Sequence, residues 1–145
     1  MNILFVCTGN TCRSPMAEVI FNSINKNKNN KAFSAGASVV PGSSISLNSA
    51  LTIKDKLNKD ISNRKAQQLQ LQHIINSDLL LTMTDNIKLY LQRLYPQHKD
   101  KIYTLNEYIG ENGDILDPYG GDISIYEKTF DMLLNRIKKL IIKIK

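Results

Sequence analysis

The chain has 145 residues, close to the ~150 of an average domain, so we expect a single domain over residues 1–145. A hydrophobic fraction of 42% and a charged fraction of 22% argue against disorder, and no apolar run has the ~20 residues of a membrane span or the basic flank of a signal peptide. The net charge of +6 comes largely from scattered lysines without a recognition-helix or zinc-finger signature, so we expect a cytoplasmic protein with no nucleic-acid partner and no membrane contact.

The N-terminal segment predicts a strand, a loop and a helix. Residues 2–6 are an apolar run cut off by a polar, Gly-containing loop, which is typical of a short buried strand. The pair Ser14-Pro15 favours a helix start, because proline is tolerated in the first helical turn. Apolar residues at helical spacing continue this helix, namely Ala17, Ile20, Phe21 and Ile24.

A second strand and a second helix are expected next. Residues 32–35 predict a strand closed by Gly36, and Pro41-Gly42 marks a turn. Residues 47–57 predict a helix whose apolar positions are Leu47, Ala50, Leu51 and Leu57.

The middle of the chain repeats the alternation of strands and helices. Residues 66–75 predict a third helix, and the continuous apolar run at residues 79–83 is typical of a strand buried on both faces. Residues 85–94 predict a helix that ends before Pro96, and residues 101–104 a fourth strand.

The C-terminal part predicts a long loop and a long helix. Residues 106–122 are rich in Gly, Asp and Pro, as loops are, and Ser124 and Glu127 have the spacing of a capping box that begins a helix. One apolar stripe follows, made of Tyr126, Phe130, Leu133, Ile137, Leu140, Ile141 and Ile144. We expect the opposite, basic face to be solvated; it carries Arg136, Lys138, Lys139, Lys143 and Lys145.

This alternation predicts an α/β fold: a single domain with a four-stranded parallel sheet and helices on both faces. In such sheets ligands bind beyond the carboxyl ends of the strands. The loop after the first strand, residues 7–14, is therefore the place to look for a functional site.

The loop has the chemistry of an anion site that carries a nucleophile. A turn between a strand and a helix presents backbone N–H groups and the positive end of the helix dipole to a ligand. Arg13 adds a planar fork that matches phosphate oxygens. Among these donors the Cys7 thiol is expected to be activated as a thiolate, which implies attack on phosphorus and a phosphocysteine intermediate.

Two other interpretations of this loop are weaker. A buried cysteine in an ordinary turn would explain Cys7, and a nucleotide-binding loop would need Gly-Lys-Ser/Thr where Arg13-Ser14 stands. The only other cysteine is Cys12, and His73 and His98 are distant in sequence, so we expect neither a disulfide scaffold nor a zinc site, and no metal or other cofactor.

The motif Cys7-X5-Arg13-Ser14, so near the start of a short chain, resembles the low-molecular-weight protein tyrosine phosphatases. Members of that family carry an Asp-Pro pair in a late loop, which is matched here by Asp117-Pro118-Tyr119. The triplet Ser34-Ala35-Gly36 after the second strand matches as well. The resemblance therefore covers the whole chain.

The resemblance implies a role for each motif residue. Cys7 would be the nucleophile, and Asp117 would protonate the leaving group and then take a proton from the attacking water. Arg13 and the loop amides would bind the phosphoryl oxygens and stabilise the transition state. The residues expected to bind the substrate or to shape its site are Thr8, Gly9, Asn10, Thr11, Cys12, Ser14 and Tyr119. The partners would be phosphorylated proteins, bound by a monomer or weak dimer.

Several of these residues also have a purely structural interpretation. Ser14, expected to stabilise the thiolate, could equally cap the helix, and Asp117 could form a simple turn. Asn10, expected to hold the loop through Ser34, also suits left-handed backbone angles. Tyr119 could serve packing alone. Cys12 could form a reversible disulfide with Cys7, as the family implies, or be a small buried filler.

Thr11 bears on which phosphorylated residue is the substrate. Tyrosine-specific members usually have a larger aliphatic residue at this position, whereas Thr11 and the late pair Gly120-Gly121 resemble the bacterial branch that acts on phosphoarginine. A hydroxyl can accept a hydrogen bond from a guanidinium and narrow the pocket against a phenyl ring. We therefore expect a protein-arginine-phosphatase, with a protein-tyrosine-phosphatase of the same mechanism, and Thr11 serving only loop geometry, as the alternative.

Three further functions have less support. A thioredoxin-linked arsenate reductase would need cysteines after Cys12, and there are none. A phosphate-binding module without activity would not need the nucleophile, the arginine and the acid together. Nucleic-acid binding depends on the net charge alone.

Overall fold

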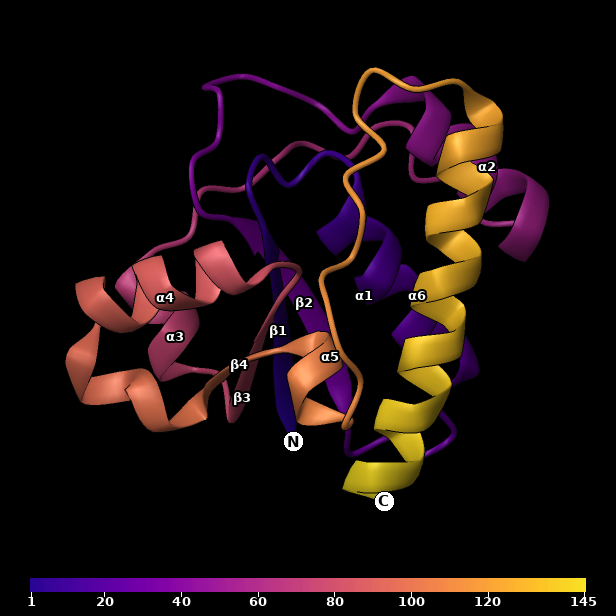
Figure 1. The fold of residues 1–145 in the computed structure, drawn as a ribbon. Helices are drawn as coiled ribbons and strands as arrows, with labels where there is room; N and C mark the ends of the chain where they lie inside the picture. Colours follow the sequence, from indigo (N-terminus) through magenta and orange to yellow (C-terminus); the bar gives the residue numbers. More distant parts are fainter.

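The sheet has four parallel strands, as the sequence predicts. A computed structural model describes all 145 residues. The strands are β1 (Asn2–Cys7), β2 (Lys31–Gly36), β3 (Leu79–Thr82) and β4 (Ile102–Thr104), in the order β2-β1-β3-β4. Because all four run the same way, their carboxyl ends meet at one edge, and the loops that follow β1 and β2 there lie in the upper half of Figure 1.

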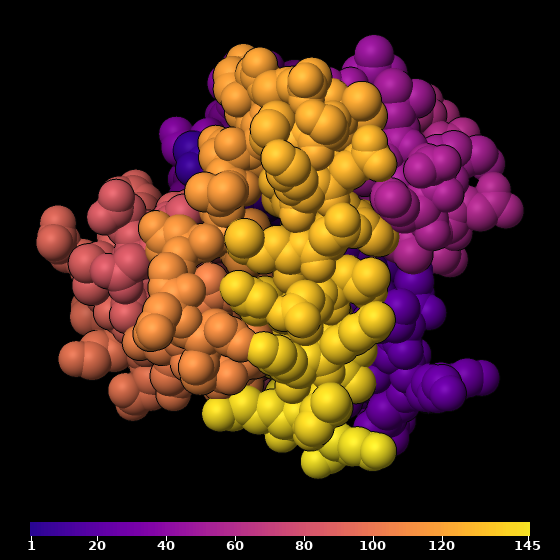
Figure 2. Space-filling model, turned by 45° about the vertical axis from the view of Figure 1, so that its right-hand side comes forward, coloured from indigo at the N-terminus to yellow at the C-terminus, as the bar shows by residue number.

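Helices cover both faces of this sheet. One face packs against α1 (Arg13–Ile24), α2 (Leu47–Leu57), α5 (Leu105–Tyr108) and α6 (Ile123–Ile144). The other packs against α3 (Leu71–Ile75) and α4 (Asp85–Leu94), with the 3-10 helix η1 (Pro96–Lys101) beside α4. In Figure 2, α6 runs the height of the molecule, with α2 to its upper right. No helix combines the length and the apolar character needed to cross a bilayer.

The central strand β1 shows why both faces are apolar. Ile3 and Phe5 pack into the larger core cluster under α1 and α6, whereas Leu4 and Val6 pack into the smaller one under α3 and α4. Alternate residues of a strand point to opposite faces, so a strand buried on both must be apolar throughout. Full burial of each such side chain contributes roughly 1.5–3 kcal/mol to the stability of the folded state.

The helix predicted for residues 66–75 is shorter than expected, and this prediction is wrong for residues 66–70. The Gly36 N–H donates to the Gln67 carbonyl and the Leu69 N–H donates to the Gly36 carbonyl, both at 2.8 Å. The end of β2 thus takes up this segment as an extended bridge and overrides its helical tendency. The helix begins only at Leu71.

The helix expected at residues 47–57 has those bounds, but its apolar positions are partly wrong. Leu47 and Leu51 are exposed, whereas Ala50 and Ile53 are buried. Two polar side chains share the buried side, Ser49 and Thr52. Thr52 donates to the carbonyl of Asn48, so its hydroxyl is satisfied inside the helix.

Two predictions in the C-terminal part are also corrected. The loop expected over residues 106–122 begins with helix α5. The last helix is capped by Asp122 rather than by Ser124 and Glu127: an Asp122 carboxylate oxygen accepts from the Ile125 N–H at 3.2 Å and from the Ser124 hydroxyl at 2.6 Å. An ionised carboxylate is the stronger acceptor at a helix N-terminus, so Ser124 serves the cap instead of forming it.

The basic face of α6 is only partly solvated, so that expectation is wrong in part. Arg136 Nε donates to the Asn106 side chain at 3.0 Å, and Lys139 pairs with Glu111. The Lys143 ammonium lies 4.8 Å from the centre of the Tyr108 ring. These contacts fasten α6 to α5 and to the segment that leads towards Asp117.

Candidate active site

The loop of residues 8–12 joins β1 to α1 at the carboxyl edge of the sheet. Three outward carbonyls are held by a neighbouring segment: those of Cys7, Thr8 and Thr11 accept from the N–H groups of Ala37, Ser38 and Ser46 at 2.8, 2.9 and 3.0 Å. The N–H groups of residues 8–12 donate to no acceptor in the protein. Free amides at a helix N-terminus can form a cup that binds an anion.

Two positions allow this loop to take its shape. Gly36 lies so close that a Cβ there would stand 2.8 Å from the Thr8 carbonyl oxygen and 3.0 Å from the Asn10 nitrogen. Asn10 has a φ of +55°, in the left-handed region that asparagine tolerates better than most residues. The structural interpretation of Asn10 therefore holds, and its side-chain contacts give it a second role.

Cys7 lies at the end of β1 and faces a donor. Its Sγ is 2.9 Å from the Ser14 hydroxyl, which accepts from Asn10 Nδ2 at 2.8 Å. The Ser14 proton is then free for the sulfur, or for the Ala35 carbonyl at 3.4 Å. A hydroxyl that donates to sulfur stabilises the thiolate. Ser14 does not cap α1, whose N-cap is Cys12 without a side-chain bond.

Arg13 is buried and connects the loop to the segment after α5. Its Nη1 donates to the Ile115 carbonyl at 3.1 Å, and its Nη2 is 3.7 Å from Asp117 Oδ2. Its Nε has no partner in the protein. Asp117 is half-exposed, and its Oδ1 accepts from the Tyr119 N–H at 3.1 Å, so the expected turn is present too. The structure thus brings Arg13 and Asp117 to one place.

A cleft of about 530 Å³ contains most of the predicted residues. Its walls include Cys7, Thr8, Gly9, Thr11, Cys12, Arg13, Asp117 and Tyr119. Asn10 and Ser14 lie beneath the loop, fully buried, and do not line the cleft. They are placed to hold the loop rather than to touch a ligand. Sequence reasoning missed a second group of residues that line this cleft, namely Ser38, Val40, Ser43, Ser44 and Ser46.

Tyr126 is a neighbour of the loop that sequence reasoning assigned only to the core. Its hydroxyl lies 3.4 Å from Cys12 Sγ, which also lies 3.5 Å from the Ser46 hydroxyl. Burial, followed by the contact with Cys12, raises the pKa of Tyr126 to about 12, so its phenol is neutral. Both cysteines are free thiols. The apolar stripe of the last helix predicts that Tyr126 is buried, but a sequence pattern does not reveal which group its hydroxyl contacts.

Comparison with known proteins finds one matching family model and several similar phosphatases. Residues 2–145 match the family model described as low molecular weight phosphotyrosine protein phosphatase. The chain is 38% identical to the protein-arginine-phosphatase of Bacillus subtilis, over 97% of this chain and 94% of that protein. It is 41% identical to the low molecular weight protein-tyrosine-phosphatase PtpB of Staphylococcus haemolyticus, over 97% of each.

Solved structures agree with the fold. The low molecular weight protein tyrosine phosphatase from T. tengcongensis superposes with a TM-score of 0.94 at 43% identity, over 99% of each chain. The YwlE arginine phosphatase from Geobacillus stearothermophilus gives a TM-score of 0.91 at 37% identity, over 99% of this chain and 92% of that one.

Proposed function

Because the chain belongs to the low molecular weight phosphotyrosine protein phosphatase family and is a cysteine-dependent protein phosphatase, we propose that it hydrolyses phosphoarginine in proteins through a phosphocysteine intermediate. The observation that carries this proposal is the cup itself. Cys7, Arg13 and four of the five loop residues with unpartnered amides line one cleft, with Asp117 at its rim.

In the first step the phosphoryl group occupies the cup and Cys7 Sγ attacks phosphorus. The S–P bond forms as the P–N bond of phosphoarginine breaks, and the proton of a protonated Asp117 passes to the leaving nitrogen. Arg13 and the free amides bind the three phosphoryl oxygens as charge develops on them. In the free enzyme the Arg13 Nη2 lies 3.7 Å from Asp117 Oδ2. When the substrate enters, the Arg13 guanidinium turns its donors to the phosphoryl oxygens, and Asp117 is released to act on the leaving group.

In the second step water attacks the phosphocysteine. Asp117, now ionised, takes the proton from the water, the S–P bond breaks, and phosphate leaves with the thiolate restored. The Ser14 hydroxyl, 2.9 Å from the sulfur, stabilises this thiolate at the start and at the end of the cycle. A solved structure of a YwlE arginine phosphatase supports such a route: it is a cysteine-to-serine mutant with a phosphorylated active-site serine.

Identity to relatives does not choose between arginine and tyrosine. Relatives named protein-arginine-phosphatase are 38% and 37% identical to this chain, and two named protein-tyrosine-phosphatase are 41% and 36% identical. The residues of the cleft favour arginine. Thr11 contributes a small side chain with a hydroxyl, and Tyr119 is followed by Gly120, so no second aromatic ring stands beside it. A planar cation fits such walls better than a phenyl ring.

The test is kcat/KM on matched phosphoarginine and phosphotyrosine peptides, for the wild type and for Thr11→Ile. We expect the wild type to prefer phosphoarginine and the variant to shift towards phosphotyrosine by about tenfold or more, the range that one pocket side chain commonly controls. A wild-type preference for phosphotyrosine would contradict the specificity and leave the alternative, a tyrosine phosphatase with the same chemistry.

A further inference from the structure

The segment that carries Asp117 forms a closed turn, residues 116–121, which we call the acid turn. The Tyr119 N–H donates to Asp117 Oδ1 at 3.1 Å. The Gly121 N–H donates to the Pro118 carbonyl at 2.8 Å. Gly121 leaves no room for a side chain, because a Cβ there would lie 3.0 Å from the Pro118 carbonyl oxygen. A shift of the Gly121 end of this turn therefore displaces the Asp117 carboxyl as well.

Two polar contacts from outside hold the acid turn. The first is the ion pair between Arg13 and Asp117, at 3.7 Å. The second is a hydrogen bond that Asn48 Nδ2 donates to the Gly121 carbonyl at 3.3 Å, and no other residue outside the turn forms a hydrogen bond to it. In the first step proposed above, Arg13 turns its donors to the phosphoryl oxygens. The Asn48 contact is then the one that remains while Asp117 gives its proton to the leaving group.

Asn48 belongs to a helix that is itself anchored near both ends. Helix α2 begins beside the loop between β1 and α1, the phosphate loop, where the Ser46 N–H donates to the Thr11 carbonyl at 3.0 Å. Near its other end, Lys56 Nζ lies 3.6 Å from Glu127 Oε2 on α6. The two helices lie side by side in Figure 2. The amide of Asn48, in the first turn of α2, is therefore fixed relative to the phosphate loop and to α6.

From these contacts we propose that Asn48 is a positioning residue that keeps the Asp117 carboxyl within reach of the leaving group. Asn48 does not line the cleft, so it acts through the acid turn and not on the substrate. Small displacements of a reacting group lower the rate steeply, so one hydrogen bond to the turn matters for proton transfer. The proposal rests on the proposed function only in taking Asp117 as the acid, and it applies equally to phosphoarginine and phosphotyrosine.

The test compares two aryl phosphates that differ in whether the leaving group needs a proton. Phenyl phosphate needs one, whereas the leaving group of para-nitrophenyl phosphate departs without it. We expect Asn48→Ala to lower kcat/KM on phenyl phosphate about three- to tenfold, the effect of losing one hydrogen bond, and to leave kcat/KM on para-nitrophenyl phosphate nearly unchanged. The inhibition constant of inorganic phosphate should stay at the wild-type value, because the cup is untouched. A contact that only stabilised the fold would lower the melting temperature and leave the ratio of the two kcat/KM values as it is.

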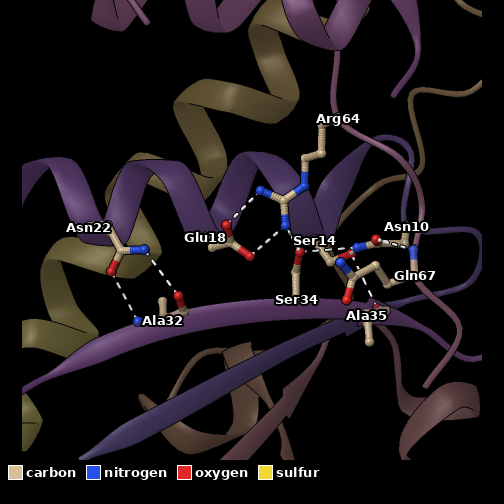
Figure 3. A network of polar contacts seen from close by, with 9 residues as sticks. All are labelled: Asn10, Ser14, Glu18, Asn22, Ala32, Ser34, Ala35, Arg64 and Gln67. Atoms are coloured by element: carbon tan, nitrogen blue, oxygen red, sulfur yellow. Dashed lines mark hydrogen bonds and ion pairs between the residues drawn. The ribbon is translucent and has the colours of Figure 1, made fainter. Parts of the chain in front are cut away.

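The matched control is Asn22→Ala, because Asn22 is also a helix asparagine that bonds to the backbone of another segment. Its Nδ2 donates to the Ala32 carbonyl at 3.0 Å, and its Oδ1 accepts from the Ala32 N–H at 2.9 Å. Figure 3 shows this pair near the start of β2, whereas Ser34 and Arg64 lie nearer to Asn10 in the phosphate loop. The control removes two hydrogen bonds instead of one, so it should cost more stability. The ratio of its two kcat/KM values should nevertheless remain that of the wild type.

Asp117→Asn is measured beside these variants, so that failure of the positioning role and failure of the proposed acid can be told apart. If Asp117→Asn loses kcat/KM selectively on phenyl phosphate and Asn48→Ala does not, the positioning role is overturned and the acid stands. Equal losses on both substrates in Asp117→Asn would show that the proposed acid is wrong, and the positioning role would fall with it. If Asn48→Ala does not fold, Asn48→Leu replaces it: the side chain keeps its volume without its donor, and the same selective loss is expected.

Discussion

The two sides of the active site are built in opposite ways. The phosphate loop and its support are buried, and Asn10, Arg13 and Ser14 each form a side-chain hydrogen bond inside the protein. The acid side is open: Leu116 and Tyr119 are exposed and Asp117 is half-exposed. The nucleophile is thus preorganised by the fold, whereas the acid is positioned by a short turn and one ion pair.

Arg13 is the link between the two sides, since it lies in the loop and bonds to the Ile115 carbonyl. Changes to the side chains that hold the loop on the buried side should therefore affect both the reactivity of Cys7 and the stability of the fold. Changes on the open side should affect catalysis alone. The predictions that follow test this difference, from the largest expected effect to the smallest.

Cys7→Ser removes the nucleophile and should abolish turnover. A serine hydroxyl is not ionised at neutral pH, so we expect kcat/KM on phosphopeptides to fall at least about a thousandfold. The exchange hardly alters volume, so the melting temperature should stay close to that of the wild type. Wild-type turnover in any Cys7 variant would contradict the mechanism.

Asp117→Asn should slow turnover and leave the buried side intact. Loss of the proton donor should lower kcat about 10²- to 10⁴-fold on substrates whose leaving group must be protonated. The loss should be much smaller on para-nitrophenyl phosphate, whose leaving group departs without a proton. Alkylation of Cys7 should follow the wild-type pH profile. An equal loss on both substrates would show that Asp117 is not the acid.

Gly36→Ala tests the close approach of β2 to the loop. The added methyl group would lie 2.8 Å from the Thr8 carbonyl oxygen, so the loop must shift, at a cost of roughly 1–3 kcal/mol of unfolding free energy. We expect kcat to fall as well. Gly110→Ala is the matched control: its φ of +80° makes alanine costly there, but no atom lies within 4 Å of the new methyl. It should lose stability and keep kcat.

The smallest expected effect is a contribution of Tyr126 to the pH dependence of stability, and it is confined to high pH. Its pKa in the folded state is raised to about 12 from an ordinary value of 10.0, so the folded protein holds this proton more tightly than the unfolded chain. The corresponding stability is present below pH 10 and is lost as the pH rises towards 12. A tyrosinate absorbance titration should show one late phenol, absent in Tyr126→Phe. A late phase that survives in the variant would assign it to another tyrosine.

The local part of the site could be predicted from the sequence. Cys7, Arg13 and Ser14 lie on one strand–loop–helix unit. The apolar run of the strand and the Ser-Pro pair at the helix start were enough to predict that these residues lie in the loop between the two elements. The Asp117-Pro118 pair was found by resemblance, because nothing local says that a turn about a hundred residues away closes over the same cleft.

The remote part could not be predicted, because it depends on contacts between segments that are far apart in sequence. Arg64 meets Glu18 and Ser34 only after α1, β2 and the segment after α2 have packed. The same holds for residues 66–70, whose partner is Gly36 rather than a helical turn of their own. Ser14 has its predicted contact with Cys7 but does not cap α1, because its hydroxyl bonds to groups from other segments instead of to the free amides of the helix start.

The most direct test of the account is to trap the covalent intermediate. Wild-type enzyme mixed with a phosphoarginine peptide is quenched in the first turnover and digested, and the phosphoryl mass is located by fragment spectra. We predict one phosphoryl group on the sulfur of Cys7, with none on Cys12 and none in Cys7→Ala. Turnover without any phosphorylated cysteine, or phosphorylation at another side chain, would contradict the central claim that Cys7 carries the reaction.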